Sequence, residues 1–394
     1  MRHRLAPVVL LQTQSENAGA QEVSRLVGER LAARGYPVHH VFLYRKSSDC
    51  AWLGDVRFCA PARPRGPLGV ARLLVRLYET LRAIRPATVV TFQHYGNVLG
   101  AVPARLAGAR VIANQTTSLR QVARPLARAD RLLGALGIYD RVVVNSAQTL
   151  SEYGVHPASY RDRLVLVEHG FDLKARTLDA QAARAALDLP AGPLLGCVAR
   201  LHPSKNLEAA IGLLARRQHW RLALAGTGPH EAVLRAHADR LGVADRVTFV
   251  GELPPARIGD FLSALDVFVF PTRIETFGLA GVEAAQAGVP VVANDIPILR
   301  EVLAVDGAPC AAFVDVDDAA ALESAVAEAL ERTPAVAARV ARAAGLAERY
   351  CASAMADAYA ALVEAVAAER APPRGAGRVE ATDDALAAER GNSR

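Results

Sequence analysis

The feature that most constrains this chain is a regular alternation of short apolar segments with helical patterns, repeated in two successive series. In the first half the strand-like segments are Pro7–Leu11, Val38–Tyr44, Ala87–Phe92, Arg110–Ala113, Arg141–Asn145 and Leu164–Val167. In the second half they are Leu194–Ala199, Arg221–Ala225, Arg246–Val250, Val267–Pro271, Pro290–Asn294 and Ala312–Val314. Strands that alternate with helices at this spacing form parallel sheets with helices on both faces. The sequence therefore predicts an α/β fold with two doubly wound domains.

The boundary between the two series is expected where an Ala-rich stretch runs into Leu187–Pro193. Beyond the second series, Ala335–Glu369 is helical by composition, with a break expected near Tyr350. The end of the chain begins with Pro372 and Pro373 and is polar, which is typical of disorder, with a short helix over Asp383–Arg390. The expected units are an N-terminal domain (1–182), a C-terminal domain (183–350), a helix that packs back on the N-terminal domain (351–370) and a disordered tail (371–394).

Composition narrows the class of protein. Apolar residues make up 52% of the 394 residues and charged residues 22%, so a large core is available. The longest apolar run falls short of the roughly 18 residues that a membrane-spanning helix needs, and the N-terminus does not read as a signal peptide. The five cysteines form no CxxC pair and read as reduced thiols. We therefore expect a cytoplasmic protein, free or at the inner face of a membrane.

The charge is distributed unevenly along the chain. Residues 1–185 carry 26 Lys and Arg against 13 Asp and Glu, a net charge of +13, whereas the whole chain carries only +6. A basic half suits an anionic partner: a phosphate-bearing substrate, an acidic membrane surface or a nucleic acid. Basic motifs interleaved with aromatic residues, which nucleic-acid binding favours, are lacking, so we expect no nucleic acid.

The first motif that carries chemistry follows the strand Leu194–Ala199. Arg200 ends that strand, Lys205 comes five residues later, and a helix is expected to begin near Asn206. Two cations beside a helix N-terminus form an anion site, because the side chains and the helix dipole act together. The alternative is two ordinary surface cations, and this motif alone does not decide between them.

The second motif holds two carboxylates. Glu275 and Glu283 are separated by seven residues after the strand Val267–Pro271. If the helix begins at Thr276–Gly278, Glu275 lies at its cap and Glu283 about two turns in, on one face. The amides of the first turn then add anion donors. The alternative is a capping glutamate and an unrelated helical one, since this spacing alone is a loose pattern.

Three further positions follow strands in the same way. Gly19 lies in the loop between the first strand and the first helix, Gly226 follows Arg221–Ala225, and Leu253 follows Arg246–Val250. No complete dinucleotide-binding glycine fingerprint is present. Each position is a weak signal alone, but together they place candidate ligand contacts at one edge of each sheet.

Taken in order, these motifs resemble a known family. The segments that carry the resemblance, from Leu194 to Leu303, are VARLHPSKNLEAAI, LALAGTGP, DRVTFVGELP and DVFVFPTRIETFGLAGVEAAQAGVPVVANDIPILREVL. They are similar to the donor-binding domain of the retaining nucleotide-sugar glycosyltransferases of family 4. Looser likeness in the first half covers AGAQEVSRLVGERLAARGYPVHHV, VVVNSAQTLSEYG and LVEHGFDL. The resemblance implies the GT-B fold, in which two Rossmann-like domains face each other across a cleft.

The resemblance also implies roles for the charged residues. Arg200 and Lys205 would hold the donor diphosphate and neutralise the charge that develops on the leaving group. Glu275 would orient the transferred sugar through its hydroxyls. Glu283 would accept hydrogen bonds from the ribose hydroxyls. Arg200, Lys205 and Glu275 are thus the expected catalytic residues.

Main-chain contacts complete the expected donor site. The amides of Phe277, Gly278 and Leu279 would contact phosphate or sugar. The main chain near Leu253 would meet the base, and the turn at Gly226 would face the same cleft. Gly19 would lie over the phosphates from the opposite domain.

The expected activity is transfer of a hexose-type sugar, with retention, from a UDP- or GDP-sugar to a saccharide or lipid-linked acceptor in bacterial exopolysaccharide, capsule or lipopolysaccharide assembly. In this family the departing phosphate is the usual candidate for the base that activates the acceptor. We expect no cofactor and no metal: Asp315–Asp318 contains a DxD sequence, but it reads as the start of a helix.

Two features bear on the acceptor. Many family members carry a histidine in the region that corresponds to Val111–Thr117, which has none here. His94, at the end of the preceding strand, is the acceptor-side candidate, and the alternative is a histidine that only satisfies a loop. Arg120–Tyr139 reads either as a helix lying on an anionic membrane or as a core-packed helix with an Arg-rich solvent face.

Other functions remain open. A non-catalytic relative acting as a binding or regulatory subunit would keep the fold, but has no reason to keep Arg200, Lys205, Glu275 and Glu283 together. A sugar-nucleotide epimerase on a similar two-domain fold is the nearest enzymatic rival, and the pair of glutamates does not favour it.

Overall fold

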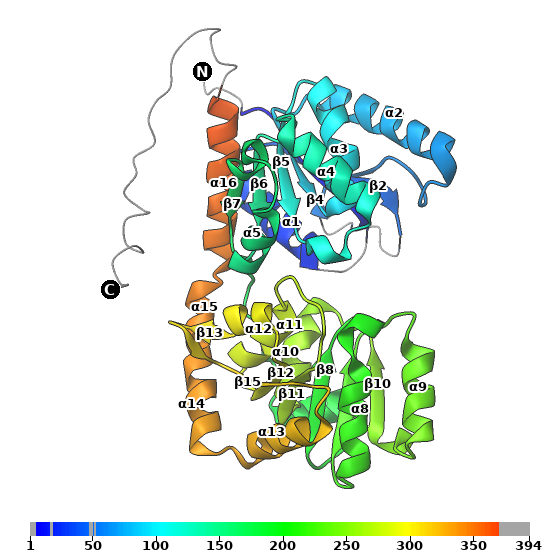
Figure 1. Cartoon of the computed structure of the whole chain (residues 1–394), viewed down its shortest axis with the longest axis vertical. Coiled ribbons are helices and arrows are strands. Elements are labelled where there is room, and N and C mark those ends of the chain that lie inside the picture. Colours follow the sequence, from blue (N-terminus) through cyan, green and yellow to red (C-terminus); the bar gives the residue numbers. More distant parts are fainter. Residues whose placement is uncertain (1–4, 16–18, 47–49, 51–52, 370–394) are drawn as a thin grey trace.

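The computed structural model describes residues 5–15, 19–46, 50 and 53–369. Two α/β domains lie one above the other (Figure 1). Each is a parallel sheet with helices on both faces, and every strand segment expected from the sequence is present. The predicted fold class is therefore confirmed.

The upper domain is built on a seven-stranded sheet in the order β3-β2-β1-β4-β5-β6-β7. Its strands are β1 (Val8–Ser15), β2 (Val38–Arg45), β3 (Val56–Phe58), β4 (Thr88–Phe92), β5 (Arg110–Gln115), β6 (Arg141–Val144) and β7 (Leu164–Leu166). All neighbours are parallel. The sequence did not predict β3, because its three residues include the exposed Arg57 and show no apolar run.

The lower domain is built on a six-stranded parallel sheet in the order β10-β9-β8-β11-β12-β15. Its strands are β8 (Leu194–Val198), β9 (Arg221–Ala225), β10 (Val247–Gly251), β11 (Val267–Phe270), β12 (Val291–Asn294) and β15 (Ala312–Val314). A small antiparallel hairpin of β13 (Ala304–Val305) and β14 (Ala308–Pro309) stands apart from that sheet.

Helices cover both faces of each sheet. Those of the upper domain are α1 (Gly19–Ala33), α2 (Gly66–Ile84), α3 (His94–Leu106), α4 (Arg124–Ala135), α5 (Ala147–Tyr153) and α6 (Ala158–Arg161). Then follow α7 (Ala180–Ala186), α8 (Leu207–Arg216), α9 (Glu231–Arg240), α10 (Pro255–Ser263), α11 (Leu279–Gln286), α12 (Pro297–Val302), α13 (Ala319–Glu331), α14 (Pro334–Arg342), α15 (Leu346–Arg349) and α16 (Ala352–Ala368).

Strand side chains alternate between the two faces, and this divides each core in two. In the upper sheet Val9 and Leu11 pack in the cluster that holds Leu77 of α2. Val8 and Leu10 of the same strand pack on the other face, with residues of α1 and α16.

The chain crosses between the domains twice. The first crossing is the segment after β7, and the second is at Tyr350–Cys351, where α15 ends and α16 begins. The two crossings lie side by side: Phe171 bridges to Cys351, and a Cβ added at Gly170 would lie 2.4 Å from the Cys351 carbonyl oxygen. The expected helix break near Tyr350 is therefore present at the crossing.

After the second crossing, α16 lies along the upper domain while α14 and α15 lie along the lower one (Figure 1). Arg30 of α1 binds Asp357 of α16 through both carboxylate oxygens, at 2.6 and 2.7 Å. Tyr359 stacks on Phe92 of β4 with ring centroids 6.4 Å apart. The predicted boundary between residues 182 and 183 lies inside α7, and the predicted tail helix Asp383–Arg390 lies outside the described residues.

Candidate functional site

The carboxyl edges of the two sheets face each other. A Cβ added at Gly19, at the start of α1 after β1, would lie 3.0 Å from Leu279 Cδ1 at the start of α11 after β11. The amides of Ala147 and Gln148, after β6, donate to the two carboxylate oxygens of Glu301 on α12, at 2.7 and 3.0 Å. Ligands of open α/β sheets bind at such edges, so the candidate site lies between the domains.

Lys205 and Glu275 form an ion pair between two loops of the lower domain. The backbone brings them together: the Ser204 carbonyl oxygen accepts from the Arg273 amide at 2.9 Å and from the Thr272 hydroxyl at 3.3 Å. The Lys205 side chain is 21% exposed and the Glu275 side chain 13% exposed. Each is therefore the counter-ion of the other in a largely shielded position.

Arg200 lies on the same loop as Lys205 but is exposed, and it makes no hydrogen bond or ion pair with another described residue. Its loop is held by the turn at Gly226. The Leu201 amide donates to the Thr227 carbonyl oxygen at 3.0 Å. A Cβ at Gly226 would lie 1.9 Å from the Ala199 carbonyl oxygen, and Gly226 has φ 131°. The close backbone approach thus explains Gly226 without a ligand contact.

Glu283 lies on α11, and the expected start of that helix is wrong. The helix begins at Leu279, because the preceding residue, Gly278, takes a left-handed conformation, φ 92°, which is not helical. Glu275 therefore lies in the preceding turn rather than at the cap, and Glu283 lies just over one turn into the helix.

The Glu283 carboxylate is held in a different environment from Glu275. Its side chain is 14% exposed, and its Oε1 lies 3.5 Å from the Nζ of Lys174. Burial raises the pKa of Glu283, and the Lys174 ammonium opposes that rise. Lys174, Arg176, Glu283 and Gln286 line a cavity of about 170 Å³ together with Leu173 and Ala287.

The remaining donor-side positions offer main chain rather than side chains. Phe277 is buried and its ring packs on His169 and Tyr350, at 5.2 and 5.0 Å between centroids. The amides of Phe277, Gly278 and Leu279 donate no hydrogen bond to another described residue. The Leu253 side chain is partly buried against the core of the lower domain.

His94 is the first residue of α3 in the upper domain and is 5% exposed. Neither ring nitrogen has a partner at hydrogen-bond geometry. Burial lowers the pKa of His94, and the nearby Asp130 carboxylate opposes that shift. Among the described residues no hydrogen bond joins His94 to Lys205 or Glu275.

Sequence reasoning missed Lys174, Glu301 and His169. Lys174 had a signal: the chain contains only three lysines, Lys46, Lys174 and Lys205, among its 46 basic residues. Lys174 pairs with Glu283 and Lys205 pairs with Glu275. Glu301 had no signal, because its partners are backbone amides of the other domain. His169 lies in the segment LVEHGFDL, which indicates nothing of the ring contact with Phe277.

The described residues contain no group of three or more His, Cys, Asp or Glu placed to hold a metal ion. Asp318 caps α13 by accepting from the Ala320 and Ala321 amides, both at 3.0 Å, so the DxD sequence begins a helix as expected. Within the same residues, no helix has the length and apolar character to cross a bilayer.

Taken together, the site can bind a ligand with two kinds of group. Arg200, Lys205 and the free amides after β11 form a cationic, hydrogen-bond-donating surface that suits a phosphate or diphosphate. The shielded carboxylates Glu275 and Glu283 accept hydrogen bonds and suit hydroxyl groups. A phosphorylated, polyhydroxylated ligand fits this combination.

Comparison with known proteins gives this chemistry a context. Residues 180–345 match the family model described as "Glycosyl transferases group 1". The lipopolysaccharide core biosynthesis mannosyltransferase LpsB of Rhizobium meliloti (strain 1021) is 35% identical over 212 residues, which are 50% of this chain and 58% of that protein. A D-inositol 3-phosphate glycosyltransferase of Nocardia farcinica is 35% identical over 171 residues, 40% of this chain and 38% of that protein. The chain thus spans little more than half of the first relative's length and less of the second.

Among solved structures, Anabaena HepE in complex with UDP and glucose superposes with a TM-score of 0.79 at 18% sequence identity. The superposition covers 91% of this chain and 100% of that one. This likeness confirms the GT-B arrangement of two Rossmann-like domains.

The free energy of unfolding at acid pH should depend on His169, because its ring is buried against Phe277 of the site. Burial lowers its pKa to about 4, against 6.5 for an exposed histidine. As the pH falls from 6.5 toward 4, the unfolded chain takes up a proton that folded His169 does not, so the free energy of unfolding falls, by up to about 3 kcal/mol. Thermal melts of wild type from pH 7 to pH 4.5 should show this decline.

The matched comparison is His169→Gln against His219→Gln, since His219 is exposed. Burial also lowers the pKa of His40 to about 4. Because His40 is present in all three proteins, it contributes the same decline of stability with falling pH to each. His169→Gln should show a shallower decline than wild type, and His219→Gln an unchanged one. Parallel slopes in all three proteins would contradict the account.

Proposed function

We propose that this protein is a retaining, metal-independent glycosyltransferase that moves a hexose-type sugar from a UDP- or GDP-sugar to a saccharide or lipid-linked acceptor. The observation that carries the proposal is the Lys205–Glu275 pair beside Arg200, at the edge of the lower sheet that faces the other domain. The family match over residues 180–345 covers these residues and supports the same activity.

The bound donor would break that ion pair and give each of its two residues a new partner. Lys205 would turn from Glu275 to the diphosphate, where the unpaired Arg200 adds a second, bidentate cation. Glu275, released from Lys205, would accept hydrogen bonds from hydroxyls of the transferred sugar. The free amides after Phe277 would complete the phosphate site, and Glu283 would receive the ribose. The main chain near Leu253 would receive the base.

Catalysis would rest on positioning and electrostatics. Charge builds on the leaving diphosphate as the glycosidic bond to it breaks, and Arg200 and Lys205 are already placed to neutralise it. Removing one preorganised donor of this kind typically costs about 10²–10³ in rate. The proposed base is the departing phosphate itself, on the face from which the acceptor attacks, which retains the anomeric configuration. Gly19, against Leu279, would close the site over the phosphates.

The acceptor would bind to the upper domain. His94 is a buried, unpaired base in that domain and remains the acceptor-side candidate. The relative LpsB is named as a lipopolysaccharide core biosynthesis mannosyltransferase, which supports a role for this protein in bacterial exopolysaccharide, capsule or lipopolysaccharide assembly. A cytoplasmic location fits such a donor and such an acceptor.

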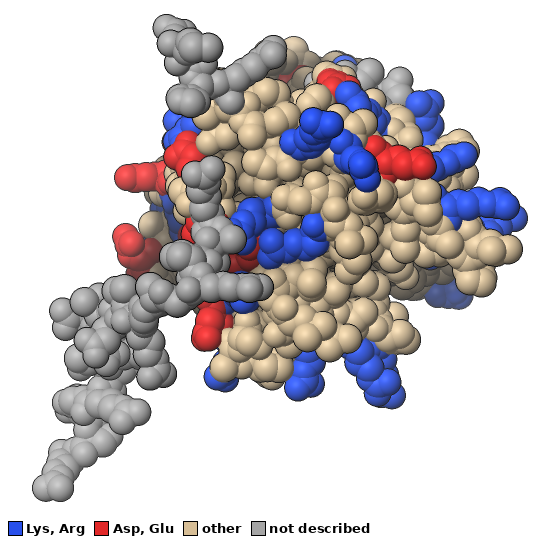
Figure 2. All heavy atoms as spheres, turned by 90° about the horizontal axis from the view of Figure 1, so that it is seen from above, with Lys and Arg blue, Asp and Glu red and all other residues tan. Residues whose placement is uncertain are grey.

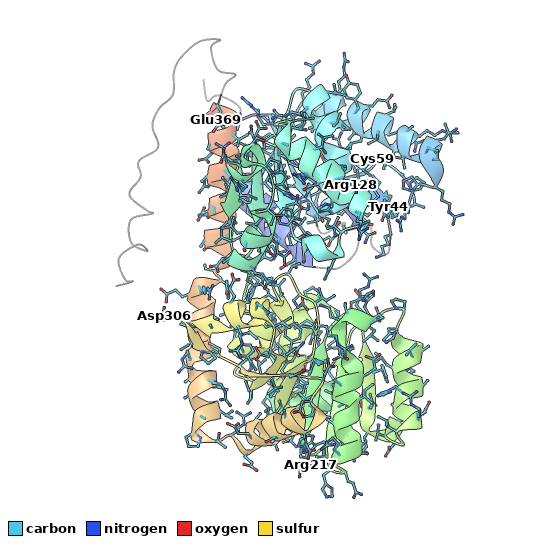
Figure 3. All side chains as sticks on the ribbon, in the orientation of Figure 1. Tyr44, Cys59, Arg128, Arg217, Asp306 and Glu369 are labelled. Atoms are coloured by element: carbon cyan, nitrogen blue, oxygen red, sulfur yellow. The ribbon has the colours of Figure 1, made fainter. Side chains whose placement is uncertain are left out.

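Peripheral contact with an anionic membrane is part of the proposal. Basic side chains are more widespread than acidic ones on the face of the upper domain in Figure 2. On α4, which carries the labelled Arg128 (Figure 3), the sequence pattern predicts Arg124, Arg128 and Arg131 on one face and Leu126, Leu133 and Leu136 on another. Leu136, which follows the last residue of α4, is 67% exposed. Its neighbours Leu132, 58% exposed, and Arg128 also face solvent. An exposed surface that combines arginine with leucine suits a lipid interface.

The inward face of α4 is mixed, because the buried Asp130 shares it with Leu133, which packs against the core of the upper domain. Asp130 is buried and accepts hydrogen bonds from Gln115, Tyr139 and Tyr160, at 2.7 to 2.9 Å. Leu133 thus gives the helix a contact with the core, and the two exposed leucines, Leu132 and Leu136, are the support for the membrane-lying interpretation.

The second candidate function is a non-catalytic relative that binds a nucleotide sugar as a regulatory subunit. The shielded Lys205–Glu275 pair disfavours it, because two buried charges need a reason to be retained beyond the fold. The epimerase alternative finds no specific support in the structure.

The donor is tested by thermal shift with UDP, GDP and ADP and their common sugar conjugates. One base should stabilise wild type by several degrees, since a ligand at a hundred times its Kd adds about 2.7 kcal/mol. Lys205→Ala and Glu283→Ala should each weaken that nucleotide at least tenfold, with each shift measured from the variant's own Tm.

The matched control is Arg217→Ala. Arg217 pairs with Glu323 at 2.6 Å, at the end of the lower domain remote from the upper one (Figure 3). Its affinity for the nucleotide should equal that of wild type. If no nucleotide stabilises wild type, or if Arg217→Ala weakens binding as much as Lys205→Ala, the proposed donor site is wrong.

Membrane contact is tested by co-sedimentation with vesicles of neutral lipid and of neutral lipid with one-third anionic lipid. Each basic residue near an anionic surface adds about 1 kcal/mol of binding free energy. Wild type should therefore bind the anionic vesicles only. The triple variant of Arg124, Arg128 and Arg131 to Ala should bind at least tenfold more weakly, and Arg217→Ala should bind like wild type. Equal sedimentation of the triple variant and wild type would exclude α4 as the contact.

A further inference from the structure

We infer that Lys174, on the segment that joins the domains, is a positioning residue that keeps Glu283 ionised and oriented for the ribose of the donor. The inference rests on the proposed function, since it assigns a role within the donor site. It concerns a residue that lies outside the sequence motifs and that the fold brings to Glu283.

The first observation is the use of lysine in this chain. Of 46 basic residues only Lys46, Lys174 and Lys205 are lysine. Lys205 pairs with Glu275 and Lys174 with Glu283, so both carboxylates of the motif face an ammonium and not a guanidinium. An ammonium is a compact charge on a flexible stem, whereas arginine binds carboxylates as a rigid fork. Lysine holds a carboxylate and still leaves it free to accept from a ligand.

The second observation is that the segment around Lys174 is fastened to the lower domain. Asp260 of α10 accepts from the Thr177 and Leu178 amides, at 2.8 and 3.0 Å. A Cβ at Gly259 would lie 2.0 Å from the Ala175 carbonyl oxygen, so only glycine admits the segment there. Arg176 donates to the Ser263 hydroxyl at 3.0 Å and to the Ala287 carbonyl oxygen at 2.8 Å. Lys174 is therefore held in place beside α11.

The third observation is that the partly buried Glu283 carboxylate needs a nearby cation to stay ionised. Its side chain is 14% exposed, and burial disfavours its charged form. Lys174, 3.5 Å away, is the only described residue that forms an ion pair with it. An ionised carboxylate accepts hydrogen bonds from both hydroxyls of a ribose, whereas a protonated one loses acceptor capacity. Lys174 thereby sets whether Glu283 can bind a vicinal diol.

The charged groups around the pair are few. From the joining segment Arg176 lines the same cavity, and from α11 the neutral Gln286 does. From α1 of the upper domain, Glu22 repels the Glu283 carboxylate and attracts Lys174, while Arg25 neutralises Glu22 at 2.7 Å. With Glu22 paired to Arg25, the charge on Lys174 remains the main support for the charge on Glu283.

The test compares Lys174→Met, which keeps the apolar stem, with Lys174→Arg, which keeps the charge. Affinity is measured by titration calorimetry at pH 8 and pH 6 for UDP, GDP and ADP, for their 2′-deoxy forms and for inorganic pyrophosphate. Phosphate groups also take up protons near pH 6. Each variant is therefore compared with wild type for the same ligand at the same pH, with Arg217→Met as the matched charge control.

The expected result is specific to the ribose. Without Lys174 the pKa of Glu283 rises further, so the carboxylate becomes protonated at a higher pH than in wild type. Lys174→Met should bind the preferred ribonucleotide more weakly than wild type, and the loss should be larger at pH 6 than at pH 8, because burial without a nearby cation favours the protonated carboxyl. Its preference for the ribonucleotide over the 2′-deoxy form should shrink, with pyrophosphate binding unchanged. Lys174→Arg should keep the wild-type pH dependence, because it keeps the charge beside Glu283, and Arg217→Met should behave as wild type in every respect.

Two results would overturn the inference: a ribonucleotide affinity in Lys174→Met that follows wild type at both pH values, or an equal loss for pyrophosphate, which would make Lys174 a phosphate ligand. If Lys174→Met does not fold, it is replaced by Glu283→Gln and by the double variant Lys174→Met, Glu283→Gln. The inference then requires the same preference for the ribonucleotide over the 2′-deoxy form in these two variants. If wild type binds no nucleotide, the proposed function itself fails. If wild type binds and Glu283→Gln alone loses the ribose preference, only the role of Lys174 is wrong.

Discussion

The ion pair between Lys205 and Glu275 is the interaction on which the site depends. It joins the loop after β8 to the loop after β11, and the hydrogen bonds from residues 272 and 273 to the Ser204 carbonyl oxygen fix the distance between those loops. Two shielded charges of opposite sign stabilise each other until a ligand offers each a better partner. In the proposed function, a diphosphate for the lysine and sugar hydroxyls for the glutamate would be such partners. Donor binding would then exchange contacts between groups that the backbone already holds together.

The second constraint is the approach of the two domains. The contact of Gly19 with Leu279 and the bonds from Glu301 to the amides after β6 bring the carboxyl edges of both sheets together. Near the first chain crossing, Arg349 at the end of α15 pairs with Glu168 at 2.7 Å. These contacts bridge the two domains, so a donor bound between them, as proposed, would be coupled to the relative position of the domains. A side chain at position 19 would require the Leu279 side chain to shift.

The sequence predicted the parts of the fold and site that depend on local order. Alternating strand and helix patterns located both sheets. Arg200, Lys205 and Glu275 were found because they come shortly after strands, and Glu283 was found by its spacing from Glu275. The start of α11 was misplaced because Gly278 takes a left-handed backbone conformation, φ 92°, which the sequence pattern does not indicate. Lys174 and Glu301 were missed because their partners are far away in sequence. The buried Asp130 of α4 was missed because its partners Gln115, Tyr139 and Tyr160 all lie outside its own helix.

The central claim is that a nucleotide sugar replaces the Lys205–Glu275 pair. The most direct measurement is a crystal structure of the protein with the intact nucleotide sugar whose base stabilises it most. The account predicts the diphosphate on Arg200 and Lys205, the sugar hydroxyls on Glu275, and the ribose on Glu283, with the Lys205–Glu275 bond broken. A donor bound elsewhere, or bound with that ion pair intact, would contradict it.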